Sequence, residues 1–307
     1  MNIRDIIVDK RFEIELNKMG SCYMNSLIYE SFIEDDLYFT TEGIGEKLSD
    51  MKNRAITTIK KLWKKVKEWI LKVIKNIKIM ITPGKKLLSE HKEEIIKAYK
   101  QYGNKITVNA PQYDVDRMKH GTFTILVLRE ISKLGSYIDN CIEGSIDFDP
   151  KECTVKIGNE YIVDEHAKIN EDVIKEISYE CVYAEKTVKP RKLSEAISAE
   201  SFIETLDGEK LYDEMKKSQK GCDESFGDMI AVFDPDKSED DNERELLEHA
   251  VKFTTAYTKA AMINMNCFLP EYKKVFRFVM AASKKLLKYD NKNDNDGKNS
   301  PDVIDND

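Results

Sequence analysis

One acidic stretch of the chain has the ligand spacing of a calcium-binding loop. Its oxygen-bearing side chains alternate along the sequence and end on a glutamate; they are Asp234, Asp236, Ser238, Asp240, Asn242 and Glu245. A calcium loop of this kind needs glycine at its sixth position, where the backbone bends sharply, and this chain has Glu239 there. We therefore predict no metal site, but a solvated acidic loop that leads into a helix whose N-terminus favours anions.

Histidine and cysteine form no recognisable site either. His249 follows Glu245 by four residues, a spacing that gives a surface ion pair far more often than a metal site. The six cysteines form no C-x-x-C pair, which is typical of single thiols in a reducing compartment. Phosphate-binding glycine loops and the G-x-S-x-G motif are also lacking. We therefore expect no catalytic residue, no cofactor and no enzymatic activity.

Positive charge is concentrated in one segment near the N-terminus. Residues 51–81 carry ten lysines and arginines but a single acid, Glu68, although the whole chain has a net charge of −7. Apolar residues recur in this segment at helical spacing and form a stripe over about a third of the circumference. The sequence therefore predicts a cationic amphipathic helix over 51–81, with Trp63 and Trp69 on or beside its apolar stripe.

Three interpretations of this helix remain open. Its stripe could pack in the core of the protein, as most such stripes do. It could instead form a coiled-coil seam with a partner or with a second copy of the chain. The helix could also lie on an anionic membrane surface or against nucleic acid. The candidate partner-binding residues are Trp63, Trp69, Lys60, Lys61, Lys64, Lys65, Lys67, Lys72 and Lys75.

Periodicity and turn signals predict a mainly helical α+β protein, with this long helix near the N-terminus and a helical hairpin at the C-terminus. Pro83-Gly84 is expected to end the cationic helix, and Pro270 to break the final hairpin. Residues 153–163 alternate in hydropathy around Gly158-Asn159, as in a β-hairpin, and 181–184 could add a third strand. The other predicted elements are helices at 85–102, 115–141, 166–178, 193–220, 242–266 and 271–288, and a loop at 104–114.

Five regions follow from these elements and from the distribution of charge. An acidic leader at 1–46 precedes a helical domain at 47–145, which contains the cationic helix. A small β-hairpin and helix unit at 146–189 is followed by a helical region at 190–289. A disordered acidic tail is expected at 290–307, because it has almost no apolar residues to bury. We expect neither a signal peptide nor a transmembrane segment.

The order of charged and apolar segments resembles that of internal or minor virion proteins of large tailed bacteriophages. The resemblance covers about half of the chain, in pattern more than in identity. Its N-terminal part is Thr41-Glu42-Gly43-Ile44-Gly45-Glu46-Lys47-Leu48, the cationic helix and Pro83-Gly84-Lys85-Lys86. Its C-terminal part is Tyr257-Thr258, Asn264, Asn266 and Glu271-Tyr272-Lys273-Lys274-Val275.

The resemblance also implies candidate processing sites, because a protease of such phages cuts after glutamate in short motifs. Glu30 and Glu200 fit this pattern, and each begins a copy of the peptide Glu-Ser-Phe-Ile-Glu, at 30–34 and at 200–204. Chance and shared helix-start preferences could also explain the repeated peptide.

The function that we expect is that of a non-enzymatic virion structural or internal head protein. Its location would be the capsid interior or the host cytoplasm. Its partners would be other virion proteins, DNA or an anionic membrane surface, and it could form a homo-oligomer. One alternative is a peripheral membrane-active or host-modulating protein that binds anionic lipid through the 51–81 helix. The other is an enzyme of unrecognised type, whose reactive groups converge from distant segments.

Overall fold

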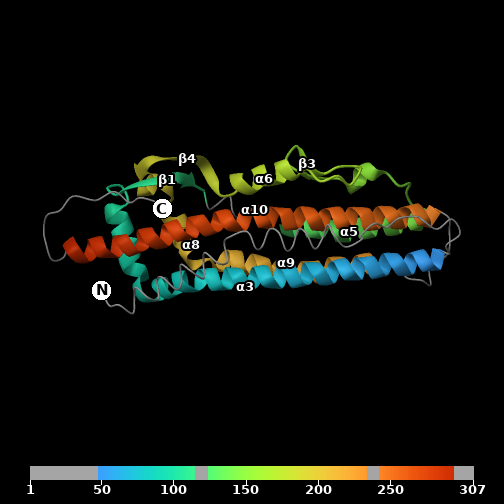
Figure 1. Ribbon diagram of the computed structural model, residues 1–307, viewed down its shortest axis with the longest axis horizontal. Coiled ribbons are helices and arrows are strands. Elements are labelled where there is room, and N and C mark those ends of the chain that lie inside the picture. The colour runs from blue at the N-terminus through green and yellow to red at the C-terminus, as the bar shows by residue number, and fades with distance from the viewer. Residues whose placement is uncertain (1–47, 115–123, 234–241, 294–307) are drawn as a thin grey trace. The chain divides into compact units, whose positions relative to one another are not determined.

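The computed structural model describes residues 48–114, 124–233 and 242–293. It is mostly helical with two small antiparallel sheets, so the predicted α+β class is confirmed (Figure 1). The helices are α3 (Leu48–Tyr102), α5 (Thr124–Ile142), α6 (Glu171–Glu180), α7 (Leu193–Ala196), α8 (Ala199–Asp207), α9 (Glu209–Ala231) and α10 (Asn242–Asn293), with a 3-10 turn η1 at Pro150–Cys153. The strands are β1 (Thr107–Tyr113), β2 (Val155–Ile157), β3 (Glu160–Val163) and β4 (Tyr183–Lys192).

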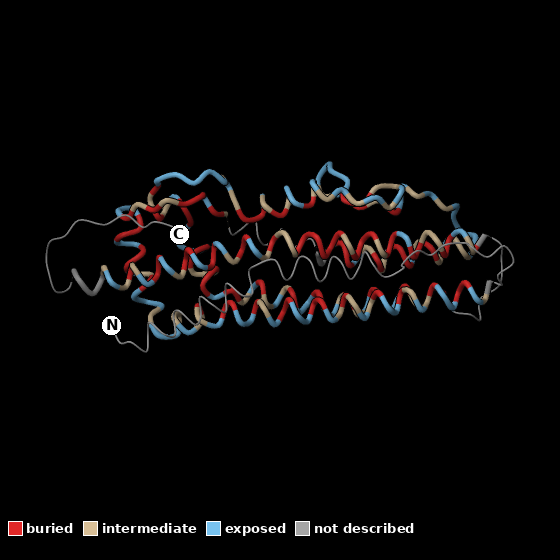
Figure 2. Tube along the Cα trace, viewed as in Figure 1, coloured by how far each residue is buried: buried red, intermediate tan, exposed pale blue. Residues whose placement is uncertain are grey.

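Four helices lie side by side and bury most of the apolar residues between them. Helix α10 packs along α3 and α5, and α9 packs against the same two helices (Figures 1 and 2). The first turns of α3 and α10 are joined by an ion pair between Lys52 and Glu243, whose charged atoms lie 3.0 Å apart. Both side chains are almost fully buried, so neither charge could lose its partner without a large free-energy cost.

Helix α3 continues through Pro83-Gly84, where the sequence had predicted its end, and that prediction is wrong. The predicted helix at 85–102 also belongs to α3, and a kink at the non-helical residue His91 (φ −138°, ψ 22°) lies within it. Proline removes one helical hydrogen bond, but contacts between α3 and the neighbouring helices keep the chain helical at Pro83. At Gly84 the helix lies so close to α8 that a Cβ atom would come within 2.1 Å of the Leu206 carbonyl oxygen.

The C-terminal region is helical, as predicted, but it is one continuous helix, so the predicted hairpin is wrong. Pro270 lies within α10 on an exposed side of the helix. Buried apolar residues on both sides of it, including Phe268 and Tyr272, pack against the rest of the protein. This packing keeps the two parts of α10 in line despite the missing hydrogen bond.

The strands are only partly as predicted. The β-hairpin is confirmed as β2 and β3, and Gly158 in its turn has a φ of +61°, which favours glycine. The predicted loop at 104–114 is wrong, because it contains β1, which pairs with β4 in antiparallel fashion. The predicted third strand at 181–184 overlaps the start of β4, but it belongs to this second sheet. Strand β4 also crosses the boundary predicted between residues 189 and 190.

The helix boundaries that differ from the predictions are mainly those set by a capping residue. Helix α6 begins later than predicted, after Asn170, whose side chain accepts a hydrogen bond from the Val173 amide. The helix predicted at 193–220 is divided into α7, α8 and α9, and Gly208 with a φ of +62° separates the last two. The tail predicted from 290 onwards begins within α10.

Some predictions fall outside the described residues. They concern the leader at 1–46 with Glu30, the start of the helix predicted at 115–141, most of the acidic loop at 234–245, and the tail beyond Asn293. Within the described ranges, no helix has an apolar stretch long enough to cross a bilayer.

Candidate functional site

The apolar stripe of α3 faces the interior of the helical bundle (Figure 2). Trp69 is only 3% exposed, and Ile59 and Val66 on the same stripe are fully buried. The indole Nε1 of Trp69 is buried without a hydrogen-bond partner among the described residues. An external partner cannot reach Trp69 in this fold, so the structure supports the interpretation of the stripe as core.

Trp63 lies at the edge of this stripe and is held by the neighbouring helix α9. Its Nε1 donates a hydrogen bond of 3.0 Å to Oδ1 of Asp223. The Nζ of Lys67 lies 3.1 Å from the same oxygen and 5.3 Å from the centre of the Trp63 ring. Two of the candidate partner-binding residues, Trp63 and Lys67, are therefore engaged within the protein, where they join α3 to α9.

The opposite side of the 51–81 segment of α3 is exposed and carries most of the cations of that segment. Within residues 51–81 the exposed lysines are Lys60, Lys61, Lys64, Lys72, Lys75 and Lys78, and we call these six residues the lysine face. Within the parts of the chain that the structure describes, no carboxylate lies within ion-pair distance of these six. Lys65 is half-buried at the edge of this side and interacts within the protein.

The lysine face divides into two groups along the helix. The first group is Lys60, Lys61 and Lys64, and the second group is Lys72, Lys75 and Lys78. The exposed residues between the groups are Glu68 and Leu71. Lys61 and Lys72 are eleven residues apart, as are Lys64 and Lys75. Eleven residues make three helical turns, so each pair points in nearly the same direction, about 16 Å apart along the axis.

The neighbouring helix α9 does not extend the lysine face. It carries the acids Asp223 and Glu224, and Lys220 pairs with Glu224 at 3.7 Å. Glu209 at the start of α9 pairs with Lys85 of α3. Helix α9 carries lysines and acids in mixed order, so the lysine face of α3 has no continuation there.

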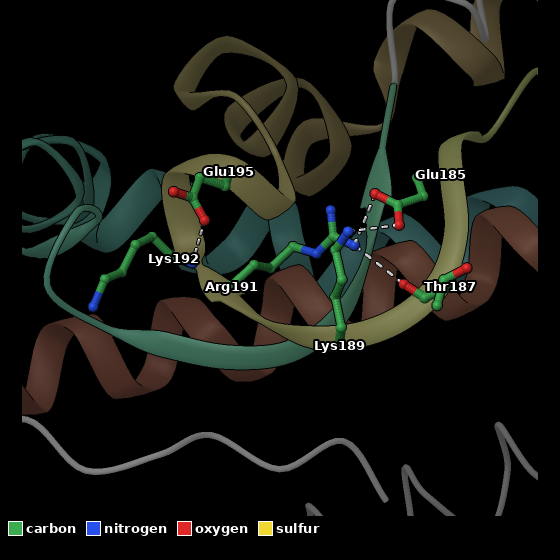
Figure 3. Close-up of polar contacts among 6 residues, drawn as sticks. All are labelled: Glu185, Thr187, Lys189, Arg191, Lys192 and Glu195. Carbon is green, nitrogen blue, oxygen red and sulfur yellow. Dashed lines mark hydrogen bonds and ion pairs between the residues drawn. The ribbon is translucent and has the colours of Figure 1, made fainter.

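A connected cluster of charged side chains lies on β4 and serves the fold (Figure 3). Nη2 of Arg191 donates to the Thr187 carbonyl oxygen at 3.1 Å and lies 3.3 Å from a carboxylate oxygen of Glu185. Lys189 donates to the other Glu185 oxygen at 2.8 Å, and this hydrogen bond is the largest cause of the lowered pKa of that carboxylate. These contacts hold the irregular stretch of β4 opposite Pro111, which has no amide hydrogen to donate to a neighbouring strand.

In the described part of the chain the groups that could do chemistry form no metal site, although Cys141 interacts with Tyr137 and with Cys153. His249 pairs with Glu245 at 3.5 Å, as predicted, and its ring stacks on Phe148 at 4.4 Å. Burial raises the pKa values of Cys153 and Cys222 to about 12, so these thiols stay protonated. The described ranges contain no group of three or more histidine, cysteine or acidic side chains that could hold a metal ion.

An open hollow of about 540 Å³ lies against the last part of α3. Glu93, Ile96, Lys97, Lys100 and Gln101 line it, and all five come from this one helix. The hollow is therefore a shallow depression in one helix surface, in contrast to a ligand site, where several elements enclose the ligand.

The candidate processing site Glu200 lies in the first turn of α8. Glu200 is exposed, but the next residue, Ser201, is buried, and its amide donates to the capping hydroxyl of Ser198 at 3.1 Å. Phe202 of the same repeated peptide is fully buried, 5.1 Å from the ring of Tyr99. A protease would therefore have to unwind the start of α8 before it could cut after Glu200.

Sequence reasoning identified the lysine face in part. Five of its six members were among the candidate partner-binding residues, and Lys78 was missed. Helical geometry could have identified Lys78, because it lies eighteen residues, or five turns, after Lys60 and so points the same way. No protein-family model matches this chain, and neither a curated protein nor a solved structure shows significant similarity to it.

Proposed function

We propose that this chain is a non-enzymatic structural or internal protein of a bacteriophage particle, which binds an anionic polymer through the lysine face. The observation that carries the proposal is the placement of six exposed lysines, without an ion-pair partner in the described ranges, on one helix whose other side is core. The fold supplies the rigid support, and the lysines supply the binding energy. The resemblance to phage virion proteins suggests where such binding would be used.

Charge alone can supply this binding. The ammonium group of an exposed lysine sits in water at the end of a flexible stem, so it can contact an anion without being buried. Each contact with a polymer phosphate releases a condensed counterion, which makes the binding favourable and dependent on salt. The net charge of the whole chain is −7, so the attraction arises from local charge.

The alternative of a lipid-binding helix has less support. A helix at a membrane interface inserts its apolar side, but the apolar side of α3 is covered by α9 and α10. The large exposed apolar side chains near the lysines are Leu71, at 46% exposure, and Ile79, at 38%. Self-association through the same face is also disfavoured, because it would bring the lysines of two copies together.

Retention on immobilised heparin, a flexible anionic polymer, tests the charge-based part of the proposal. Replacing all six lysines of the face by glutamine should lower the salt concentration at which the protein elutes. The control replaces six other exposed lysines, so that the net charge is the same; these are Lys92, Lys100, Lys151, Lys168, Lys217 and Lys252. The control should elute close to the wild-type protein, and equal losses in the two variants would refute the role of the lysine face.

Mass spectrometry of purified phage particles tests the location. The chain should be present in particles from which loosely bound protein has been removed by washing in high salt. Its absence from such particles, together with its presence in the infected-cell lysate, would contradict the virion assignment.

A further inference from the structure

We infer that the anionic polymer is double-stranded DNA, and that α3 lies along the duplex with its two lysine groups on successive backbone crossings. This inference rests on the proposed function, because it names the partner of the same face. Three features of the lysine face carry it: the separation of its groups, their common direction, and the acid between them.

The separation of the two groups matches the surface of a duplex. Lys61 and Lys64 are each followed, after eleven residues, by a lysine of the second group. At 1.5 Å per residue these pairs are about 16 Å apart along the helix axis. B-form DNA repeats about every 34 Å, so a line along its surface crosses one of the two backbones every ~17 Å on average. Both groups can therefore reach phosphates at the same time.

The two groups also point in a common direction. The non-helical residue of α3, His91, lies beyond the second group, so the helix is regular from Lys60 to Lys78. Helices α8, α9 and α10 pack against the other sides of α3. This packing fixes the backbone positions from which the lysines project. A pre-arranged row of charges loses less conformational freedom on binding than a flexible chain would.

Glu68 gives the third argument. This exposed acid lies between the two groups, where it would repel an evenly charged surface. On a duplex the same position lies over a groove, away from the two phosphate crossings. Lysines that contact phosphates, with no base contact, predict binding that is independent of DNA sequence.

The favoured test moves charge along α3 without changing its amount. The triple variant Glu68→Lys, Lys72→Gln and Lys75→Gln keeps the net charge, because it gains two charges at one position and loses one at each of the others. All three positions are exposed, so the fold should be retained, which circular dichroism would check. We expect heparin retention to be unchanged and the affinity for a 30-base-pair duplex, an arbitrary probe length of about three turns, to fall about tenfold.

The salt dependence of duplex binding gives an independent readout. The slope of log affinity against log salt should become shallower by about two in the triple variant, because two phosphate contacts are lost. The wild-type slope and affinity should be the same for duplexes of unrelated sequence.

The outcomes separate the two proposals. Unchanged duplex affinity and slope in the triple variant would refute the spacing argument, while the charge-based function would stand. Tighter wild-type binding to anionic vesicles or to polyglutamate than to the duplex, at equal charge concentration, would refute DNA as the partner. No retention of the wild-type protein on heparin would refute the proposed function itself.

Discussion

Asp223 is the residue on which the junction of α3 and α9 depends. It accepts a hydrogen bond from Trp63 and pairs with Lys67, and its own side chain is 36% exposed. These contacts also decide that Trp63 is held within the protein and that Lys67 is not part of the lysine face. Because the groups are partly exposed, water screens the ion pair, and the hydrogen bond to the indole is the stronger contribution.

Replacing Asp223 by alanine should lower the free energy of unfolding by about 1 kcal/mol, because Trp63 and Lys67 lose their shared partner. Urea denaturation followed by circular dichroism would measure the change. Glu224→Ala is the matched control, since it removes the same charge from the next residue of α9 and affects only the long pair with Lys220. A loss in the control as large as that in Asp223→Ala would show that general charge, and no specific contact, is responsible.

Among the elements, the close contact between α3 and α8 explains why a glycine lies within a long helix. Gly84 allows the Leu206 carbonyl oxygen of α8 to approach the α3 backbone, where any Cβ atom would collide with it. Gly208, the residue after α8, leaves room for α3 in the same way, because a Cβ atom there would lie 2.3 Å from the Ile81 side chain. Gly84 lets the α8 backbone approach α3, and Gly208 leaves room for the Ile81 side chain.

The change Gly84→Ala should destabilise the protein by about 2 kcal/mol, because the added methyl group must displace the backbone of α8. Gly227→Ala in α9 is its counterpart, since no atom lies within 4 Å of the added Cβ there. That change should raise stability by about 0.5–1 kcal/mol, the ordinary advantage of alanine in a helix. Thermal denaturation of both variants would compare them, and equal effects would contradict the close contact.

At the scale of the whole molecule, the interior holds many ionisable groups in their neutral form. Burial raises the pKa values of Tyr99, Tyr113, Cys153 and Cys222 to about 12. It also raises those of Tyr183, Tyr257 and Tyr272. In the unfolded chain these side chains would lose protons near their ordinary values of 9.0 for cysteine and 10.0 for tyrosine. Between the two pKa values the folded state holds more protons than the unfolded state.

Stability should therefore be independent of these groups below pH 9 and should decrease as the pH rises from about 9 towards 12. Each fully buried group can contribute a slope of up to about 1.4 kcal/mol per pH unit. Lys273, whose pKa burial lowers from 10.5 to about 8, acts in the opposite direction, but it is a single group. Urea denaturation at a series of pH values would measure the trend.

Tyrosinate absorbance gives the companion observation. The buried tyrosines should ionise together with the loss of helical circular dichroism, because they remain protonated while the protein is folded. Ionisation of all tyrosines near pH 10 with the helices intact would contradict the burial on which this prediction depends.

Properties that depend on neighbouring residues could be predicted from the order of amino acids alone. The helical period of residues 51–81 predicted both the apolar stripe and the side that carries the lysines, because a helix places every third and fourth residue on one side. The turn at Gly158-Asn159 predicted the β-hairpin for the same local reason. Much of the lysine face therefore follows from the order of residues within one segment.

What covers each face, and where the long helices end, depends instead on contacts between distant segments. Trp63 meets Asp223 across 160 residues of sequence, and β1 pairs with β4 across all the elements between them, with no local signal for either contact. Pro83 and Pro270 are local helix breakers, yet both lie inside helices. Local preferences amount to a few kcal/mol at most, and the burial of apolar side chains between distant segments outweighs them.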